Sequence, residues 1–259
     1  TQKGLKPKIA LVMGDNILGQ LDDFYPKMCS FENLETKESF DHIRSQIKSA
    51  NVYFGAMPIV DALRKWDPDI IITGRSTDTG LTLAPMVYEF NWDCKDWDKL
   101  ASGIVAGHLL ECGCQVTGGN FSDWKSLDAY HDIGYPIAEV SADGSFVLTK
   151  HSQTGGLVSV DTVREQVFYE MGDPSAYITP DVIADFSTIH LEQEATDRVM
   201  VSGIKGCEPT SHYKVSMAYE NGYKAIGSII ISGPNAKEKA DRFADIFWKR
   251  CQINFSETL

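Results

Sequence analysis

The sequence predicts an α/β fold, with a mostly parallel sheet and flanking helices in residues 1–130 and a strand-rich α+β part in residues 131–259. Two observations lead to this prediction. In the first part, short continuous apolar runs alternate with helix-like stretches, which is typical of buried parallel strands joined by helical crossovers. In the second part, turn residues separate short strand-like segments that indicate hairpins. No low-complexity linker divides the two parts, so we expect them to share an interface.

The first part is expected to contain four strands and four helices. Strands are predicted at 8–13, 52–54, 69–73 and 114–117. The first three are short and mainly apolar, and each of the four is followed by a glycine that ends it. The helical stretches between them are 34–49, which is polar, 59–66, which has a proline in its first turn, 79–90, which Pro85 interrupts, and 97–112.

The clearest helix is the one that Asp96 precedes and Gly113 ends. Its apolar side chains follow the i, i+3, i+4, i+7 pattern of an amphipathic helix. Gly103 and Gly107 are four residues apart, and we interpret them as a site of close helix packing.

The second part is expected to begin with a hairpin over 138–150 and a helix that Ser159 caps and that runs to residue 169. Two further strands are predicted around the turn at 196–197. A hairpin over 213–231 is predicted from its Asn-Gly turn, and a final helix from Pro234 to Cys251.

Charge and composition exclude several classes of protein. The chain has 24 Lys and Arg against 36 Asp and Glu, a net charge of −12, which argues against a nucleic-acid binder and against docking on an anionic membrane. No run approaches the roughly 18 apolar residues of a membrane span. Six cysteines without a CxxC pair or a secretory start predict reduced thiols, hence an intracellular location, either cytoplasmic or in the mitochondrial matrix.

Three of the predicted strands end in loops that are rich in glycine and polar residues, at 14–16, 74–78 and 117–120. Strand ends of an open parallel sheet meet at one edge, where ligands bind. Glycines expose backbone N–H groups to an anion, and an arginine offers a planar fork for a carboxylate or phosphate. Alternatively, each glycine only turns the chain and each Asp or Asn caps a helix. The candidate substrate-binding residues are Gly14, Asp15, Gly74, Arg75, Thr117, Gly118, Gly119 and Asn120.

The candidate catalytic residues are His108, Glu111 and Asp78. The histidine lies near the end of the Asp96 helix, just before the third loop, where it can serve as a general base or remain a buried structural side chain. A partial zinc site with Cys112 and Cys114 is conceivable, but the spacing is unusual and no fourth ligand is evident, so we expect no bound metal.

A further glycine loop, Thr154, Gly155 and Gly156, leads into the Ser159 helix. Free N–H groups at a helix N-terminus can hold an anion, and Lys150 and Lys214 are candidate counter-charges. The alternative is a flexible connection beside a solvated lysine. No Walker loop, dinucleotide glycine motif, serine elbow or HExxH motif is present, so the residues by themselves predict a small-anion site and no specific reaction.

The sequence resembles the acyclic terpene utilisation protein family (AtuA-like). The matching motifs follow one another along nearly the whole chain: GAMPIV at 55–60, IITGRSTD at 71–78, LAP at 83–85, DWDKLA at 96–101, GHLLECG at 107–113, QVTGG at 115–119, YPIAEV at 135–140, DGSF at 143–146, TGGLV at 154–158, YE at 169–170 and DPxxYxTPDV at 173–182. It departs from the family pattern at Cys114, where a small residue is expected, and at Asn120, where an aromatic residue is common.

The resemblance implies that a further segment, with a glycine-rich opening, precedes the first strand in family members. It also implies a role in the breakdown of branched acyclic terpenoids through acyl-CoA intermediates. We therefore expect an enzyme with a lyase- or hydratase-type step on a branched hydroxyacyl-CoA. The CoA thioester is then the substrate carrier, and no cofactor is expected. The alternatives are a non-catalytic subunit that binds acyl-CoA or a protein partner, and a metal-dependent enzyme that uses Asp15 and Asp78. A homo-oligomer or a larger assembly is expected.

Overall fold

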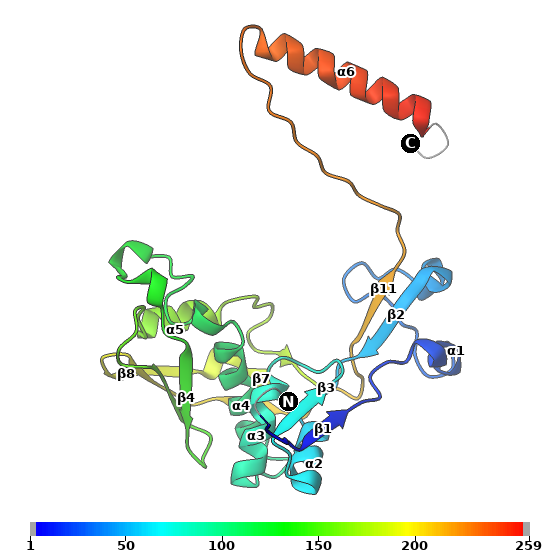
Figure 1. Ribbon diagram of the computed structural model, residues 1–259. Coiled ribbons are helices and arrows are strands. Elements are labelled where there is room, and N and C mark those ends of the chain that lie inside the picture. Colours follow the sequence, from blue (N-terminus) through cyan, green and yellow to red (C-terminus); the bar gives the residue numbers. More distant parts are fainter. Residues whose placement is uncertain (1–3, 256–259) are drawn as a thin grey trace. The chain divides into compact units, whose positions relative to one another are not determined.

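The computed structural model describes residues 4–255 and confirms a mixed α/β chain (Figure 1). The chain divides into two compact units, residues 4–220 and 221–255. Pairing between strands is mostly antiparallel. The strands are β1 (Ile9–Val12), β2 (Ile47–Val52), β3 (Ile70–Thr73), β4 (Pro136–Val140), β5 (Phe146–Lys150), β6 (Tyr177–Ile178), β7 (Ile183–Asp185), β8 (His190–Ala195), β9 (Arg198–Ser202), β10 (Lys205–Cys207) and β11 (Val215–Tyr219).

The α-helices are α1 (Leu21–Phe24), α2 (Met57–Trp66), α3 (Gly80–Phe90), α4 (Trp97–Leu110), α5 (Val160–Val167) and α6 (Ala236–Asn254). Short 3₁₀ helices lie at Leu18–Gln20, Phe40–His42, Arg44–Gln46, Gly113–Gln115, Trp124–Ser126, Tyr130–Asp132 and Phe186–Thr188. Among residues 4–255, no helix combines the length and the apolar character that a membrane span requires.

Among the strands of residues 4–255, only β1 and β3 pair in parallel, in register from Ile9 opposite Ile70 to Val12 opposite Thr73. The prediction of a mostly parallel sheet in the first part therefore holds only for this pair of strands. The second predicted strand lies earlier, in β2, and pairs antiparallel with β11 from much later in the chain. Such a long-range partner leaves no local signal in the sequence.

The fourth predicted strand, at 114–117, is wrong. This segment belongs to a 3₁₀ turn, because Gly113 has a positive φ of 56° and the N–H of Gly119 bonds back to the carbonyl of Cys114 at 2.9 Å. The helix predicted at 34–49 is also wrong. The side chain of Asn33 accepts the backbone N–H groups of Glu35 and Thr36, a local turn that competes with helix formation.

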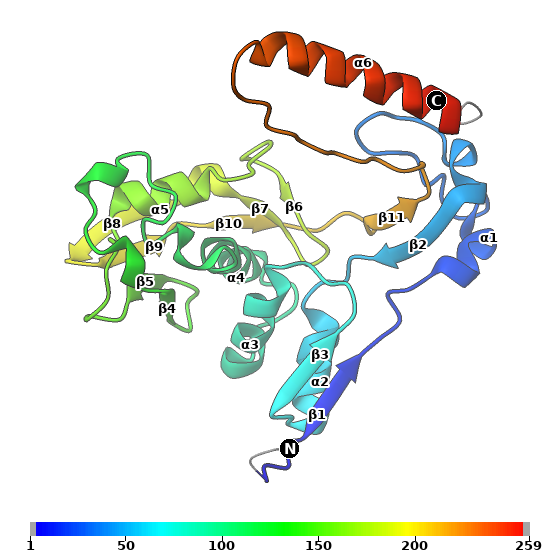
Figure 2. The ribbon, with the colours of Figure 1, turned by 45° about the horizontal axis from the view of Figure 1, so that its top comes forward.

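Helix α4 forms the centre of the larger unit. All ten residues from 100 to 109 are buried, as expected of a helix that is covered on every side. It contacts α3, α5, β7 and β10 (Figure 2), so the core joins segments from both sides of residue 130. A Cβ on Gly103 would overlap with Leu83 of α3, and one on Gly107 with Thr79, which confirms that these glycines allow close packing.

The later strands of the larger unit form two antiparallel sheets, in the orders β4-β5-β9-β8 and β10-β7-β6. The hairpins predicted at 138–150 and around 196–197 are both present. Ser159 caps α5 as predicted, in a capping box with Thr162. The hairpin predicted at 213–231 is wrong, because β11 pairs with β2 and the chain from 221 to 235 has no strand.

The smaller unit, residues 221–255, contains α6 as its one α-helix within the part of the chain that the structure describes. The predicted final helix is thus confirmed, and it extends three residues beyond Cys251.

Candidate functional site

The first two predicted loops come together in one open cavity of about 430 Å³. Loop 14–16 follows β1, and loop 74–78 follows β3. These two strands are parallel neighbours, so both loops leave the same end of the pair. The cavity is lined by Asp15, Asn51, Thr73, Gly74, Arg75, Ser76, Asp78 and Leu81. Gly14 directly precedes this lining and has a positive φ of 112°, a conformation that favours glycine.

Asp15 holds the two loops together. One oxygen of its carboxylate accepts the backbone N–H of Arg75 at 2.9 Å and the side-chain amide of Asn51 at 2.7 Å. These hydrogen bonds, above all the one from the Arg75 backbone, lower the pKa of Asp15. The carboxylate is therefore ionised and engaged, which makes Asp15 a structural anchor of the cavity.

Arg75 carries a guanidinium group at this cavity. Its side chain is exposed and lies over the ring of Tyr53, 5.2 Å from the centroid. Lys214 approaches the same ring, with Nζ 5.3 Å from the centroid. Neither cation forms an ion pair with a carboxylate within residues 4–255.

Glu111 lies at the C-terminal end of α4, in surroundings that favour its neutral form. Burial raises its pKa to about 7, and the negative charges of Asp78 and Glu170 contribute to the same shift. The side chain of Glu111 is only one-fifth exposed. A carboxyl group with a pKa near neutrality can both release and take up a proton under physiological conditions.

His108 is completely buried one helical turn before Glu111. Its Nε2 lies 2.9 Å from the backbone carbonyl oxygen of Gln166, and its Nδ1 lies 3.7 Å from Oε1 of Glu111. Burial lowers the pKa of the ring, so the imidazole is neutral at pH 7. Because a carbonyl oxygen only accepts, Nε2 must carry the hydrogen, and the lone pair of Nδ1 faces Glu111.

Aromatic rings close this buried group on one side. Tyr177 and Phe186 contact the imidazole of His108 edge-to-face, at centroid distances of 5.6 and 5.3 Å. Burial raises the pKa of Tyr177 to about 12, with a further contribution from Glu111, so its hydroxyl keeps its proton. Tyr177 and Phe186 thus cover the imidazole of His108 on this side.

Asp78 connects the two groups of residues. It lines the cavity beside Arg75, and its charge acts on both Glu111 and Tyr177. Asp78 is therefore an electrostatic neighbour of Glu111, which in turn lies 3.7 Å from His108.

The third predicted loop does not line this cavity. Thr117 is buried, and its hydroxyl donates to the carbonyl of Gly134 at 2.5 Å, while its own carbonyl accepts the N–H of Leu157 at 2.8 Å. A Cβ on Gly118 or Gly119 would overlap with Leu127 or with the Cys114 backbone. Asn120 is exposed. The expectation that all three loops share an edge is wrong, because residues 114–117 are not a strand beside β1 and β3.

The loop at 154–156 lies against the third loop. A Cβ on Gly156 would overlap with the carbonyl oxygen of Thr117, and one on Gly155 with that of Ala129. Lys150 is buried and donates to the carbonyl of Thr154 at 2.9 Å. It also pairs with Asp197 at 3.1 Å. This lysine already has an anionic partner, so these contacts connect chain segments within the fold.

Three residues of the site were not predicted from the sequence: Asn51, Glu170 and Tyr177. Glu170 and Tyr177 lie in motifs shared with the family that the sequence resembles, at 169–170 and 173–182. Their place in these motifs is the sequence signal that could have identified them. Asn51 has no such signal, because its place beside Asp15 depends on the position of β2. In residues 4–255, no group of three or more His, Cys, Asp or Glu side chains is arranged to hold a metal ion.

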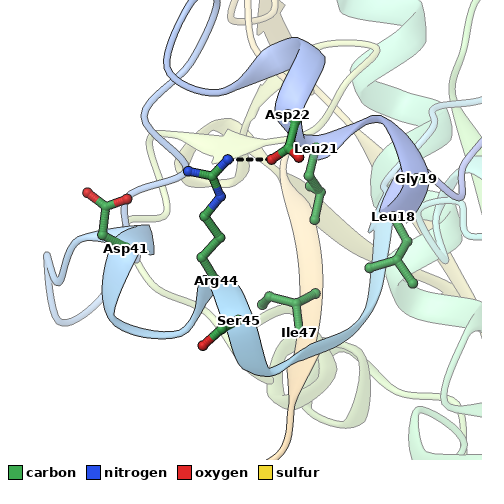
Figure 3. A pocket seen from close by; sticks show the side chains of 8 residues that line it. All are labelled: Leu18, Gly19, Leu21, Asp22, Asp41, Arg44, Ser45 and Ile47. Atoms are coloured by element: carbon green, nitrogen blue, oxygen red, sulfur yellow. Dashed lines mark hydrogen bonds and ion pairs between the residues drawn. The ribbon is translucent and has the colours of Figure 1, made fainter.

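Two other cavities have linings that share no residue with the Asp15–Arg75 cavity. One, of about 500 Å³, is lined by Arg44 and by apolar side chains such as Leu18 and Ile47 (Figure 3). Asp22 already neutralises its arginine, which leaves no free cation there. Another, of about 440 Å³, lies near α5 and β8, and Phe186 lines it.

The family model described as "Acyclic terpene utilisation family protein AtuA" matches residues 1–258. No curated protein and no solved structure matches the chain. Because the match covers almost the whole sequence, the chain belongs to the AtuA family, and this membership implies a role in acyclic terpene utilisation.

Proposed function

We propose that the protein is an enzyme that performs a lyase- or hydratase-type step on a branched hydroxyacyl-CoA during the breakdown of acyclic terpenoids. The observation that carries the proposal is the pair formed by Glu111 and His108, whose Oε1 and Nδ1 atoms lie 3.7 Å apart. Family membership supports the terpenoid setting, and the pair supports acid–base chemistry.

The pair is suited to hold one proton. The Nε2–H of His108 is committed to the carbonyl of Gln166, so Nδ1 is the acceptor that faces the carboxyl group. The pKa of Glu111, about 7, lets that carboxyl carry a proton near neutral pH. A small movement brings the two atoms within hydrogen-bond distance, as is common when substrate completes a site.

Both reaction types need one positioned group that moves a proton beside a thioester carbonyl. In the lyase-type step, the base takes the proton of a tertiary alcohol and the adjacent C–C bond breaks. Its electrons form a thioester enolate, which then takes up a proton. In the hydratase-type step, water adds H and OH across a double bond. Neither step changes the oxidation balance, and a positioned acid or base typically contributes ~10²–10⁴-fold.

The cavity beside Asp78 offers a place for an anionic part of the substrate near the acid–base pair. Asp78 lines it and acts electrostatically on Glu111, and Arg75 lies at its wall. A guanidinium fork binds a carboxylate or phosphate through two parallel hydrogen bonds. We infer that Arg75 holds an anionic group of the substrate while Glu111 moves the proton.

The test compares turnover of a branched 3-hydroxyacyl-CoA by the wild type, Glu111→Gln and His108→Ala. We expect Glu111→Gln to lose ~10²-fold or more in kcat. Glu89→Gln serves as the matched control, because Glu89 is exposed on α3 and should leave kcat unchanged. Equal rates for the wild type and His108→Ala would remove the histidine from the mechanism, and equal rates for Glu111→Gln would overturn the proposed acid–base role.

A second candidate function is a non-catalytic subunit that binds acyl-CoA or a protein partner within a larger assembly. The exposed face of the β1–β3 pair favours it, since Ile9, Leu11, Ile70 and Ile72 are each about half exposed or more. Parallel strands are normally covered on both faces. Saturable binding without turnover, together with co-purification of a stoichiometric partner, would support this candidate. A monomeric mass by light scattering would argue against the expected homo-oligomer.

A further inference from the structure

Three chain segments that are distant in sequence lie side by side around Tyr53. The backbone N–H of Tyr53 donates to the carbonyl of Lys214 at 2.9 Å, and the N–H of Phe54 donates to the carbonyl of Arg75 at 3.3 Å. The segment that carries Tyr53 therefore has Lys214 on one neighbouring segment and Arg75 on another. This arrangement is a product of the fold, because β11 reaches β2 from the end of the larger unit.

The two cations converge on one aromatic ring. Arg75 and Lys214 lie 5.2 and 5.3 Å from the centroid of Tyr53, within the range of cation–π attraction. Placing two positive groups about one ring costs repulsion, and no carboxylate pairs with either of them in residues 4–255. The lack of compensation is notable in a chain with 36 acidic against 24 basic residues.

The other cation–π contacts of the described chain differ from this one. Arg44 lies over Tyr25, but Asp22 neutralises it. Lys65 and Lys125 each lie over the tryptophan next to them in sequence, with no second cation on the ring. The Tyr53 group is thus distinct in combining two uncompensated cations from separate segments.

The chemistry of the group indicates the class of ligand. A guanidinium fork and an ammonium point charge together match a group with two or more negative charges and several acceptor oxygens, which describes phosphate better than a single carboxylate. Ser76 lines the cavity beside Arg75, and a serine hydroxyl is able to donate to a phosphate oxygen. The nearby carboxylate of Asp15 is already bonded to Asn51 and to the Arg75 backbone, which reduces its repulsion of an anion.

We propose that Arg75, Tyr53 and Lys214 form a phosphate-binding site that holds the phosphorylated end of the CoA carrier. The inference rests on the proposed function for the identity of the carrier. It assigns to Lys214 a binding role at the site, and it leaves the acid–base pair of His108 and Glu111 free for the acyl end.

The test measures binding of CoA and of pantetheine, which lacks the phosphates, by calorimetry with the full chain. We expect CoA to bind more tightly than pantetheine, and Lys214→Ala to weaken CoA binding roughly tenfold, as the loss of one charge-assisted contact implies. Lys214→Arg should retain most of the affinity. Lys65→Ala is the matched control, because Lys65 also lies on an aromatic ring but has no second cation there.

The outcomes separate this inference from the proposed function. Equal affinity of wild type and Lys214→Ala for CoA, or equal affinity of the wild type for CoA and pantetheine, would overturn the phosphate site even if turnover depends on Glu111. Phosphate-dependent binding that needs Lys214 in a protein without turnover would support the site and remove the proposed reaction. Circular dichroism of Lys214→Ala confirms that the variant is folded. If it is not, Lys214→Gln, which removes the charge and keeps most of the side chain, provides the same comparison.

Discussion

The carboxylate of Asp15 occupies the space that a side chain at Gly74 would fill. From this position it accepts the backbone N–H of Arg75 at 2.9 Å and the amide of Asn51 at 2.7 Å. The absence of a Cβ at residue 74 therefore lets the loops after β1 and β3 approach each other closely enough to form one cavity.

Gly74→Ala is expected to displace Asp15 and destabilise the fold. Overpacking of this kind typically costs about 1–3 kcal/mol, here with the loss of the bonds from Arg75 and Asn51. Urea denaturation measures the loss. Gly172→Ala is the control, because a Cβ there meets no atom within 4 Å, and it should have little effect on the free energy of unfolding. Equal stability of the two variants would contradict the close contact.

Glu111→Gln is expected to stabilise the protein at pH 8 relative to the wild type. The pKa of Glu111 rises from 4.5 to about 7 on folding, so the folded state binds the proton more tightly than the unfolded state. The wild type therefore loses stability as pH rises from about 4.5 to 7, by at most about 3 kcal/mol from this group. The glutamine side chain does not ionise, so the variant does not lose this stability as the pH rises.

Denaturation of both proteins at pH 5 and pH 8 measures the effect. The difference in stability between variant and wild type should shift in favour of the variant at the higher pH. A difference that does not change with pH would show that Glu111 has an ordinary pKa.

Asp78→Asn is expected to lower the pKa of Glu111 while leaving it above 4.5. Burial is the larger cause of the raised value and remains, whereas the negative charge of Asp78 is removed. The titration of the Glu111 carboxyl carbon by NMR measures the shift. Asp61→Asn, which changes an exposed residue of α2, is the charge-matched control and should leave the titration unchanged.

Ser159→Ala is expected to cost about 1 kcal/mol of stability, the usual value for a lost N-cap. The hydroxyl of Ser159 accepts the N–H of Thr162 at 3.2 Å, and the Thr162 hydroxyl accepts the N–H of Ser159 at 3.0 Å. Thermal denaturation measures the change, with exposed Ser30→Ala as the control. Helix α5 also carries Gln166, whose backbone carbonyl oxygen accepts the hydrogen bond from Nε2 of His108. A weakened helix should therefore also broaden the NMR signals of the His108 imidazole.

Several elements could be predicted because their causes are local. The buried helix α4, the capping of α5 and the two hairpins around 142–144 and 196–197 follow from periodicity, cap residues and turn residues within short windows. The close approach of Arg75 and Asp15 also follows, since β1 and β3 are parallel neighbours whose ends meet. The order of the motifs along the chain was also enough to identify the family that the sequence resembles.

Other features depend on partners that lie far away along the chain. The pairing of β2 with β11 joins residues near 50 to residues near 217, and it brings Lys214 to the ring of Tyr53. The segment 114–117 follows a helix and precedes a glycine turn, as a strand would, but it turns back on itself and contacts the loop at 154–157. The same burial by remote segments raises the pKa of Glu111 and selects the tautomer of His108. Short stretches of sequence thus determine much of the secondary structure and identify the family. The protonation of Glu111, the tautomer of His108 and the position of Lys214 depend on burial and on contacts between distant segments.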